Sequence, residues 1–306
     1  MFVLETKGLT KKYGEHLAVN HVNMHIEKGD IYGFVGENGA GKTTIIRLIT
    51  GLASATEGNF ELFGVDNNSK EIRLAKKKLG GIVESVSINM SMNAMDNLGL
   101  QAILAGVKLT LSDKENLLKK VGLNPEEIAK KKVNSFSLGM RQRLGIAMTL
   151  VSNPEFIILD EPMNGLDPKG FIEIRDVILE LNKEGITFLI SSHILSELEK
   201  ICTKIGFISH GKLIKELTIE DIHNQSKKRI VIEALDLEEL NQILKDKMNL
   251  VDTKIVGKEL YIYDSIDINE ILRFLVKNKI EIININKSED TIETYYMKLI
   301  GGSFND

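Results

Sequence analysis

The sequence has few of the features that would tie a chain to the cell exterior or to the interior of a membrane. Cys202 is the only cysteine among 306 residues, so no disulfide can form within the chain, as is typical of cytoplasmic proteins. The longest apolar runs, such as Phe156–Leu159, fall far short of the roughly 20 residues that a membrane helix needs. The first residues, Met1–Lys7, become charged too early for a secretory signal. We therefore expect a cytoplasmic protein that docks on a membrane protein.

The chain also lacks a strong excess of positive charge. Its net charge of −4 argues against a general nucleic-acid binder, and we expect no nucleic-acid partner. Hydrophobic residues make up 43% of the sequence, which is enough to bury a substantial core. A length of 306 residues predicts roughly two domains.

The first two thirds of the chain alternate strand-like and helix-like patterns. Short buried strands are predicted at Ile31–Val35, Phe156–Leu159 and Thr187–Ile190. From about residue 85 to residue 150 the pattern is helical, with polar joints. These features predict an α/β domain over residues 1–217 with a helical subdomain inserted into it.

The last third of the chain has a different pattern of predicted strands and helices. We predict strands at Arg229–Ala234, Val251–Val256, Leu260–Tyr263 and Ile280–Ile285, with a helical face after the first and the third. The order βαββαβ matches the ferredoxin-like plan, so residues 227–306 are predicted to form a small α+β domain that ends in a further helix. Residues 218–226 would be the linker. This tail has no visible catalytic cluster, and it could regulate, dimerise or brace the first domain.

A phosphate-binding loop follows the first of the buried strands. Gly36–Thr43 fits the pattern GxxxxGK[ST], and a helix pattern begins directly after it, as the motif requires. The glycines let backbone N–H groups surround phosphates, Lys42 supplies a positive charge, and the Thr43 hydroxyl can bind Mg²⁺. The candidate nucleotide-binding residues here are Gly36, Glu37, Asn38, Gly39, Ala40, Gly41, Lys42, Thr43 and Thr44.

Two acids, Asp160 and Glu161, come at the end of a later buried strand. Because parallel α/β sheets bind ligands at the carboxyl ends of their strands, we expect Asp160 near Mg²⁺ and Glu161 as a general base for water. His193 ends the next strand; a single histidine is often structural, but this place favours a γ-phosphate contact. Tyr13 could stack on adenine or pack at a turn.

A second helix start, with a small hydroxyl residue and a glycine, lies at Phe136–Gln142. Ser137 and Gly139 stand where free N–H groups and the helix dipole favour an anion. Since Gly36–Thr43 already supplies a phosphate site, a second one suggests that ATP is shared between two copies of the chain.

Taken in order, these elements resemble the ATP-binding subunit of an ABC transporter over roughly residues 1–217. The resemblance implies an aromatic adenine contact at Tyr13, a D-loop at Asp167, a switch histidine at His193 and catalytic Glu161. It also implies a head-to-tail dimer with two ATP molecules, in which a signature segment acts on the partner's ATP. That segment would contain Ser137, Leu138, Gly139, Met140 and Gln142.

The sequence departs from the common family pattern in two places. The usual signature is Leu-Ser-Gly-Gly-Gln, and here Phe136, Leu138 and Met140 replace its first, third and fifth residues. Glu84 stands where the family has the glutamine of the Q-loop, and its carboxylate could serve as an additional Mg²⁺ ligand. Both departures are similar to the bacitracin-transport and lantibiotic-immunity type of subunit.

The resemblance implies an ATPase that powers export or membrane clearance of antimicrobial peptides through a separate permease. The subunit would be cytoplasmic and peripheral, held at the inner face of the membrane by that permease. Export of another cargo, such as a drug, an ion or a lipid, stays open. A non-transport ABC ATPase acting on DNA or ribosomes is disfavoured by the single cassette and the acidic net charge.

Overall fold

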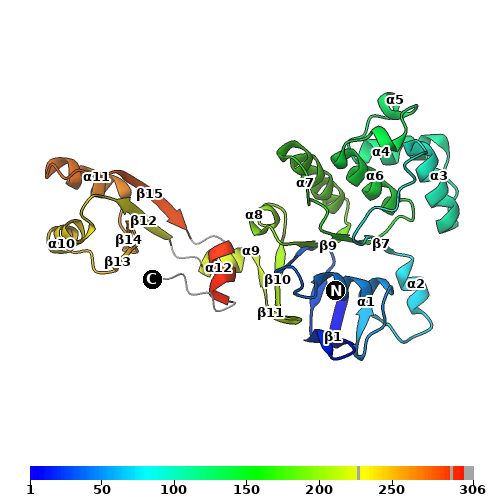
Figure 1. Ribbon diagram of the computed structural model, residues 1–306, viewed down its shortest axis with the longest axis horizontal. Helices are drawn as coiled ribbons and strands as arrows, with labels where there is room; N and C mark the ends of the chain where they lie inside the picture. Colours follow the sequence, from blue (N-terminus) through cyan, green and yellow to red (C-terminus); the bar gives the residue numbers. More distant parts are fainter. Residues whose placement is uncertain (226–227, 290–291, 300–306) are drawn as a thin grey trace. The chain divides into compact units, whose positions relative to one another are not determined.

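The computed structural model describes residues 1–225, 228–289 and 292–299, and the chain divides into two compact units between Ile219 and Glu220 (Figure 1). Within this described part, none of the helices is both long enough and apolar enough to cross a membrane.

The first unit is built on a six-stranded sheet with the strand order β11-β10-β4-β9-β8-β7. β10, β4, β9, β8 and β7 are parallel, and β11 pairs antiparallel with β10. The strands are β4 (Ile31–Val35), β7 (Leu79–Ile82), β8 (Phe156–Asp160), β9 (Thr187–Ser192), β10 (Lys204–Ser209) and β11 (Lys212–Thr218). Every residue of β4, β8 and β9 is buried, as expected for central parallel strands covered on both faces. This sheet confirms the predicted α/β fold.

A second, antiparallel sheet, which the sequence patterns did not reveal, forms from the N-terminal strands. Its strands are β1 (Phe2–Tyr13), β2 (His16–Val22), β3 (His25–Glu27), β5 (Glu57–Leu62) and β6 (Val65–Asp66). The long strand β1 pairs with β2, β3 and β5. Leu4 and Leu9 of β1 pack in the same core cluster as Phe34 of β4 and Ile45 of α1, so the two sheets share one hydrophobic core.

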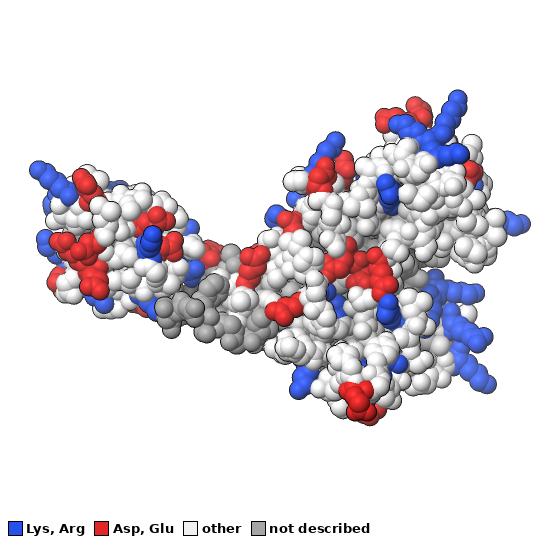
Figure 2. All heavy atoms as spheres, viewed as in Figure 1, with Lys and Arg blue, Asp and Glu red and all other residues white. Residues whose placement is uncertain are grey.

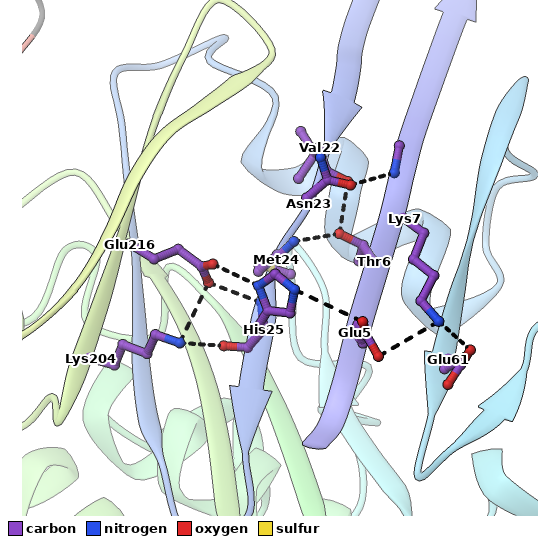
Figure 3. A network of polar contacts seen from close by, with 11 residues as sticks. Glu5, Thr6, Lys7, Val22, Asn23, Met24, His25, Glu61, Lys204 and Glu216 are labelled. Atoms are coloured by element: carbon purple, nitrogen blue, oxygen red, sulfur yellow. Dashed lines mark hydrogen bonds and ion pairs between the residues drawn. The ribbon is translucent and has the colours of Figure 1, made fainter. Parts of the chain in front are cut away.

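A polar network also joins the two sheets (Figure 3). His25 of β3 places Nδ1 3.0 Å from the carboxylate of Glu216 on β11, and its Nε2 lies 4.0 Å from Glu5 of β1. Lys204 of β10 donates to the carbonyl oxygen of His25 at 2.9 Å. The Tyr32 hydroxyl donates to Glu216 at 2.9 Å, and burial, followed by the charge of Glu216, raises the pKa of this phenol well above its ordinary value.

The helices of the first unit lie between its strands along the chain, and several of them belong to the predicted insertion. They are α1 (Lys42–Thr50), α2 (Ile72–Lys76), α3 (Ala94–Ala105), α4 (Leu111–Lys120), α5 (Pro125–Ile128), a 3₁₀ turn (Val133–Ser135), α6 (Leu138–Leu150), α7 (Pro168–Lys183) and α8 (Leu195–Leu198). Between β7 and β8 the described chain contains only helices and their connections, as the sequence predicts for this region. Thr110 and Asp113 form a reciprocal capping box at the start of α4.

The second unit contains a four-stranded antiparallel sheet in the order β13-β14-β12-β15. Its elements are α9 (Ile219–Gln225), β12 (Lys228–Glu233), α10 (Leu237–Met248), β13 (Thr253–Val256), β14 (Glu259–Ile262), α11 (Ile268–Lys277), β15 (Asn284–Glu289) and α12 (Ile292–Leu299). Ile232, Leu260 and Ile262 of the sheet pack with Leu244 of α10 and Ile271 of α11 in a core of their own. From β12 to β15 the element order is βαββαβ, and the ferredoxin-like plan stays our interpretation of it.

One prediction for this part of the chain was wrong in detail. The predicted strand at Ile280–Ile285 begins only at Asn284, because the hydrogen-bonded register with β12 runs from Asn284 to Glu289. Within the predicted linker, residues 218–226, the structure places helix α9. Residues 226–227 and 300–306, which include the predicted domain start and the chain end, lie outside the described residues.

Candidate functional site

The phosphate loop connects the carboxyl end of β4 to the N-terminus of α1, and glycine is required at two of its positions. A Cβ atom at Gly36 would lie 2.4 Å from the carbonyl oxygen of Ile208, which no real contact allows. Gly41 caps α1 with φ of 108°, and a Cβ atom there would lie 2.6 Å from the carbonyl oxygen of Ala18. The loop therefore needs its glycines for both space and backbone conformation.

Lys42 is the first residue of α1 and is buried, with 6% of its surface exposed. Its ammonium group donates to the carbonyl oxygens of Gly36 at 2.6 Å and Glu37 at 3.3 Å, so the side chain folds back across the loop. A cation, the positive end of a helix dipole and free helix N–H groups are thereby concentrated at one point. This is the arrangement that binds phosphate.

Asp160, the last residue of β8, ties three elements together. Its carboxylate accepts hydrogen bonds from the Thr43 hydroxyl of α1 at 3.0 Å and from the Ser191 hydroxyl of β9 at 2.5 Å. The Ser191 hydroxyl also accepts from the backbone N–H of Glu161 at 2.9 Å. Asp160 is only 5% exposed, so this network fixes its orientation beside the phosphate loop.

Glu161 has a left-handed backbone with φ of 49°, which turns its side chain out of β8 toward the loop and His193. One carboxylate oxygen lies 3.5 Å from the Lys42 ammonium group, and the other lies 2.9 Å from Nδ1 of His193. Because an ionised carboxylate only accepts hydrogen bonds, Nδ1 of His193 carries the proton in this pair. The lysine, the acid and the histidine therefore form one connected group.

These residues open onto a cavity of about 560 Å³. It is lined by Tyr13, His16, Ala18, Glu37, Asn38, Gly39, Gly41, Lys42, Thr43, Thr44, Glu161, Asn164 and His193. Ten of these residues were predicted from the sequence, and His16, Ala18 and Asn164 were missed. His16 pairs with Tyr13 across the turn between β1 and β2, so recognising that hairpin would have found it. Gly36 and Ala40, also predicted, shape the loop without lining the cavity.

Tyr13 stands at the rim of this cavity with 45% of its surface exposed. The Lys11 ammonium group lies 4.9 Å above the ring centroid, a cation–π contact that holds one face of the ring. An exposed aromatic ring beside a phosphate loop is suited to stacking on a flat base.

The signature segment lines a different cavity. Ser137 caps α6, and its hydroxyl accepts from the backbone N–H of Met140 at 3.2 Å. The cavity beside it measures about 470 Å³ and includes Leu138, Gly139 and Asp167, but it shares no lining residue with the phosphate-loop cavity. Asp167 caps α7 through Gly170 N–H at 2.8 Å. Within one copy of the chain, therefore, the predicted signature does not reach the nucleotide cavity.

Gln142 was predicted as part of the signature segment, but it lines neither of these two cavities. Its side-chain carbonyl oxygen is buried and has no hydrogen-bond donor among the described residues.

Glu84 lies two residues after the end of β7, with a left-handed backbone (φ of 62°). Its carboxylate pairs with Arg47, in the last turn of α1, and it does not line the nucleotide cavity. The neighbouring residues instead line a groove of about 330 Å³ between Leu79–Ser87 and helices α3 and α6. Its role as a Mg²⁺ ligand thus stays a prediction.

The chain belongs to the family of ABC transporter ATP-binding proteins. Residues 19–164 match the family described as ABC transporter. Members of this family bind ATP and couple its hydrolysis to transport, so the chain is an ATPase of this kind and the predicted family is confirmed.

Relatives whose names state a transport function match 80% or more of this chain. It is 41% identical over 303 residues to the bacitracin transport ATP-binding protein BcrA of Enterococcus faecalis, covering 98% of this chain and 97% of that protein. It is 42% identical over 247 residues to the lantibiotic transport ATP-binding protein SrtF of Streptococcus pyogenes, covering 80% of this chain and 99% of that protein. A solved dimeric ATP-binding cassette in a post-hydrolysis state with ADP and Pi is 26% identical, with a TM-score of 0.62 over 71% of this chain and 98% of that one.

Proposed function

We propose that the chain is the ATP-hydrolysing subunit of an ABC exporter that removes antimicrobial peptides of the bacitracin type through a separate permease. One observation carries this proposal: the bacitracin transport proteins of Enterococcus faecalis and Bacillus licheniformis match 98% of this chain, at 41% and 39% identity. The lantibiotic relative matches 80% of it. Peptides of the lantibiotic type are therefore the second cargo to test.

ATP would enter the cavity beside the phosphate loop. Tyr13 stacks on the adenine, and Gly36–Thr44 hold the phosphates through backbone N–H groups. Lys42 leaves its two carbonyl partners to neutralise the β and γ phosphates. The concentration of donors at the start of α1 supports these roles.

Glu161 would act as the general base that takes a proton from the attacking water. His193 orients it through the 2.9 Å contact and, with its remaining ring nitrogen, faces the γ-phosphate. The left-handed backbone of Glu161 supports this assignment, since strained conformations of this kind are concentrated at functional sites.

The donor set at the end of β8 suits Mg²⁺. The Thr43 hydroxyl and the Asp160 carboxylate are hard oxygen donors 3.0 Å apart, and Mg²⁺ in nucleotide sites takes few protein ligands besides phosphate and water. When bound, the ion would neutralise charge on the β and γ phosphates. Ser191 holds Asp160 in place for this role.

Glu84 would join this donor set only by leaving its ion pair with Arg47. A Mg²⁺ titration of ATP turnover tests this: if Glu84 is a ligand, Glu84→Ala raises the Mg²⁺ concentration needed for half-maximal turnover. An unchanged titration would leave Glu84 with its Arg47 contact alone.

Two copies would be needed to complete each site. Ser137, Leu138, Gly139, Met140 and Gln142 of one copy would act on the ATP held by the other, with Asp167 beside them. The separation of the two cavities within one copy supports this arrangement. The dimeric form of the solved relative supports it as well.

The permease would dock at the groove beside Leu79–Ser87, which Gln101 of α3 also lines. Ile103 and Leu104 of α3 are 77% and 74% exposed, and Met90 is 37% exposed. Flexible methionine side chains suit an adaptable contact. The chain would then work at the cytoplasmic face of the membrane.

The proposal is tested by co-expressing the chain with the permease encoded beside it. Resistance of the strain to bacitracin and to a lantibiotic is measured separately. We expect raised resistance to bacitracin, and we expect Glu161→Gln, made in the same strain, to abolish it. Resistance to neither peptide, with both subunits expressed and ATPase activity intact, would contradict the proposed cargo.

A further inference from the structure

A group of positive side chains lies on and beside the short helix α2. Lys70, Arg73, Lys76 and Lys77, which we call the α2 basic patch, fall within eight consecutive residues. Lys70, Arg73 and Lys77 are exposed, and Lys76 is half-buried. Figure 2 shows basic side chains gathered over this region, at the right-hand edge of the view.

The charge of this patch is not compensated locally. In the described part of the chain, none of its four cations forms an ion pair, whereas the next residue, Lys78, pairs with Glu155 at 2.8 Å. The one acid within the segment, Glu71, accepts a hydrogen bond from the hydroxyl of Ser69. Three of the four cations are exposed to solvent, and the segment from Lys70 to Lys77 remains positively charged with Glu71 included.

Apolar side chains accompany these charges. Leu74, in the middle of α2, is 64% exposed, and Leu52, which follows α1, is 68% exposed. The Lys76 ammonium group lies over Gly51, the residue before Leu52, so the end of α1 and the α2 basic patch form one continuous surface. Basic residues with exposed leucines among them are characteristic of surfaces that bind the interface of an anionic bilayer.

The patch also adjoins the groove proposed for the permease. Leu52 and Leu79 both line that groove, and Leu79 follows the patch by two residues. A chain docked there would present the patch close to the membrane.

We propose that the α2 basic patch binds the anionic lipid headgroups of the membrane beside the permease. Its cations bind the lipid phosphates while Leu52 and Leu74 enter the headgroup region. Three of the four cations are lysines. A lysine acts as a point charge, whereas the planar guanidinium of arginine is shaped for bidentate contact with one carboxylate. The patch therefore suits lipid phosphates that move laterally better than it suits one acidic protein segment. The inference rests on the proposed function only in assuming that a permease brings the chain to a membrane.

Flotation with protein-free vesicles tests this lipid contact. We expect the full chain to bind vesicles of equal parts phosphatidylglycerol and phosphatidylcholine, and not phosphatidylcholine alone. Raising the salt from about 0.1 M to about 1 M, which shortens the Debye length from about 10 Å to about 3 Å, should release it. Arg73→Gln/Lys76→Gln/Lys77→Gln should weaken binding by at least about tenfold, since each basic residue near an anionic surface contributes separately.

The chain offers a control with the same loss of charge. Lys130→Gln/Lys131→Gln/Lys132→Gln removes three exposed lysines elsewhere, and we expect it to bind vesicles like the unaltered chain. Equal loss in both triple variants, or no preference for phosphatidylglycerol, would overturn the proposal. Since these vesicles contain no permease, failure here leaves the proposed function untouched.

Discussion

The two units of this chain use their polar residues in opposite ways. In the first unit, side chains from α1, β8 and β9 converge on one cavity, and Asp160 and Lys42 are buried there with their partners. In the second unit, the buried residues of the core cluster are aliphatic, and polar contacts such as that of Asp236 with the Glu239 N–H cap its helices. In the described part of the chain, the residues that line the nucleotide cavity all come from the first unit.

The relatives differ in how much of this chain they match. The lantibiotic transport protein is matched over 99% of its length yet leaves about a fifth of this chain unmatched, whereas the bacitracin transport proteins match nearly all of it.

The largest effect is expected at Glu161. Glu161→Gln keeps the shape of the side chain but removes the base, so we expect ATP turnover to fall by about 10²–10⁴-fold while ATP still binds. Steady-state phosphate release measures it. Glu238→Gln, an exposed carboxylate of α10 in the second unit, is the control and should leave turnover unchanged. Undiminished turnover in Glu161→Gln would remove Glu161 from the role of base.

The next effect is on nucleotide affinity. Lys42→Ala removes the buried cation of the phosphate loop, and we expect ATP affinity to fall by about 100-fold, since hydrogen bonds to charged groups contribute about 1.5–3 kcal/mol each. Titration with a fluorescent ATP analogue measures this loss. Lys245→Ala in α10 provides the control. Affinity equal to that of the unaltered chain would refute the assignment of the phosphate loop.

The sequence revealed the phosphate loop, Asp160, Glu161 and His193 because each depends on a local pattern at a strand end. His16 escaped because its place in the cavity comes from a hairpin with Tyr13. The error in the predicted strand at Ile280–Ile285 had a different cause. Ile280 and Ile282 pack on the second core and alternate with Glu281 as residues of a strand do, but the hydrogen bonds to β12 begin only at Asn284.

A smaller, selective effect is expected from the second core. Leu260→Ala removes a fully buried side chain of β14 and should lower the free energy of unfolding of the second unit by about 2–5 kcal/mol. ATP affinity should stay unchanged, because none of the described residues of this unit lines the nucleotide cavity. Hydrogen exchange of β12–β15 measures the stability of the second unit, and an ATP titration of the same variant measures the affinity. A matching loss of ATP affinity would break the contrast between the units.

The smallest effect is expected from removing the second unit. A chain ending at residue 225 keeps every residue that lines the nucleotide and signature cavities. We expect its ATP turnover to stay within about twofold of the full chain, a change of under about 0.5 kcal/mol in the barrier. Phosphate release by the purified truncated chain measures it. A large fall in turnover would assign the second unit a part in catalysis.

Sharing of ATP between two copies is the central claim, and the mass of the Glu161→Gln variant in the presence of ATP tests it most directly. The phosphate loop and the signature segment line separate cavities in one copy, so in the proposed arrangement two copies enclose ATP. Analytical ultracentrifugation should give twice the chain mass of 34.2 kDa with ATP and a single mass without it. Ser137→Asp, which places a negative charge where a phosphate should bind, should prevent the dimer. A variant that binds ATP and stays at the single mass would contradict the account.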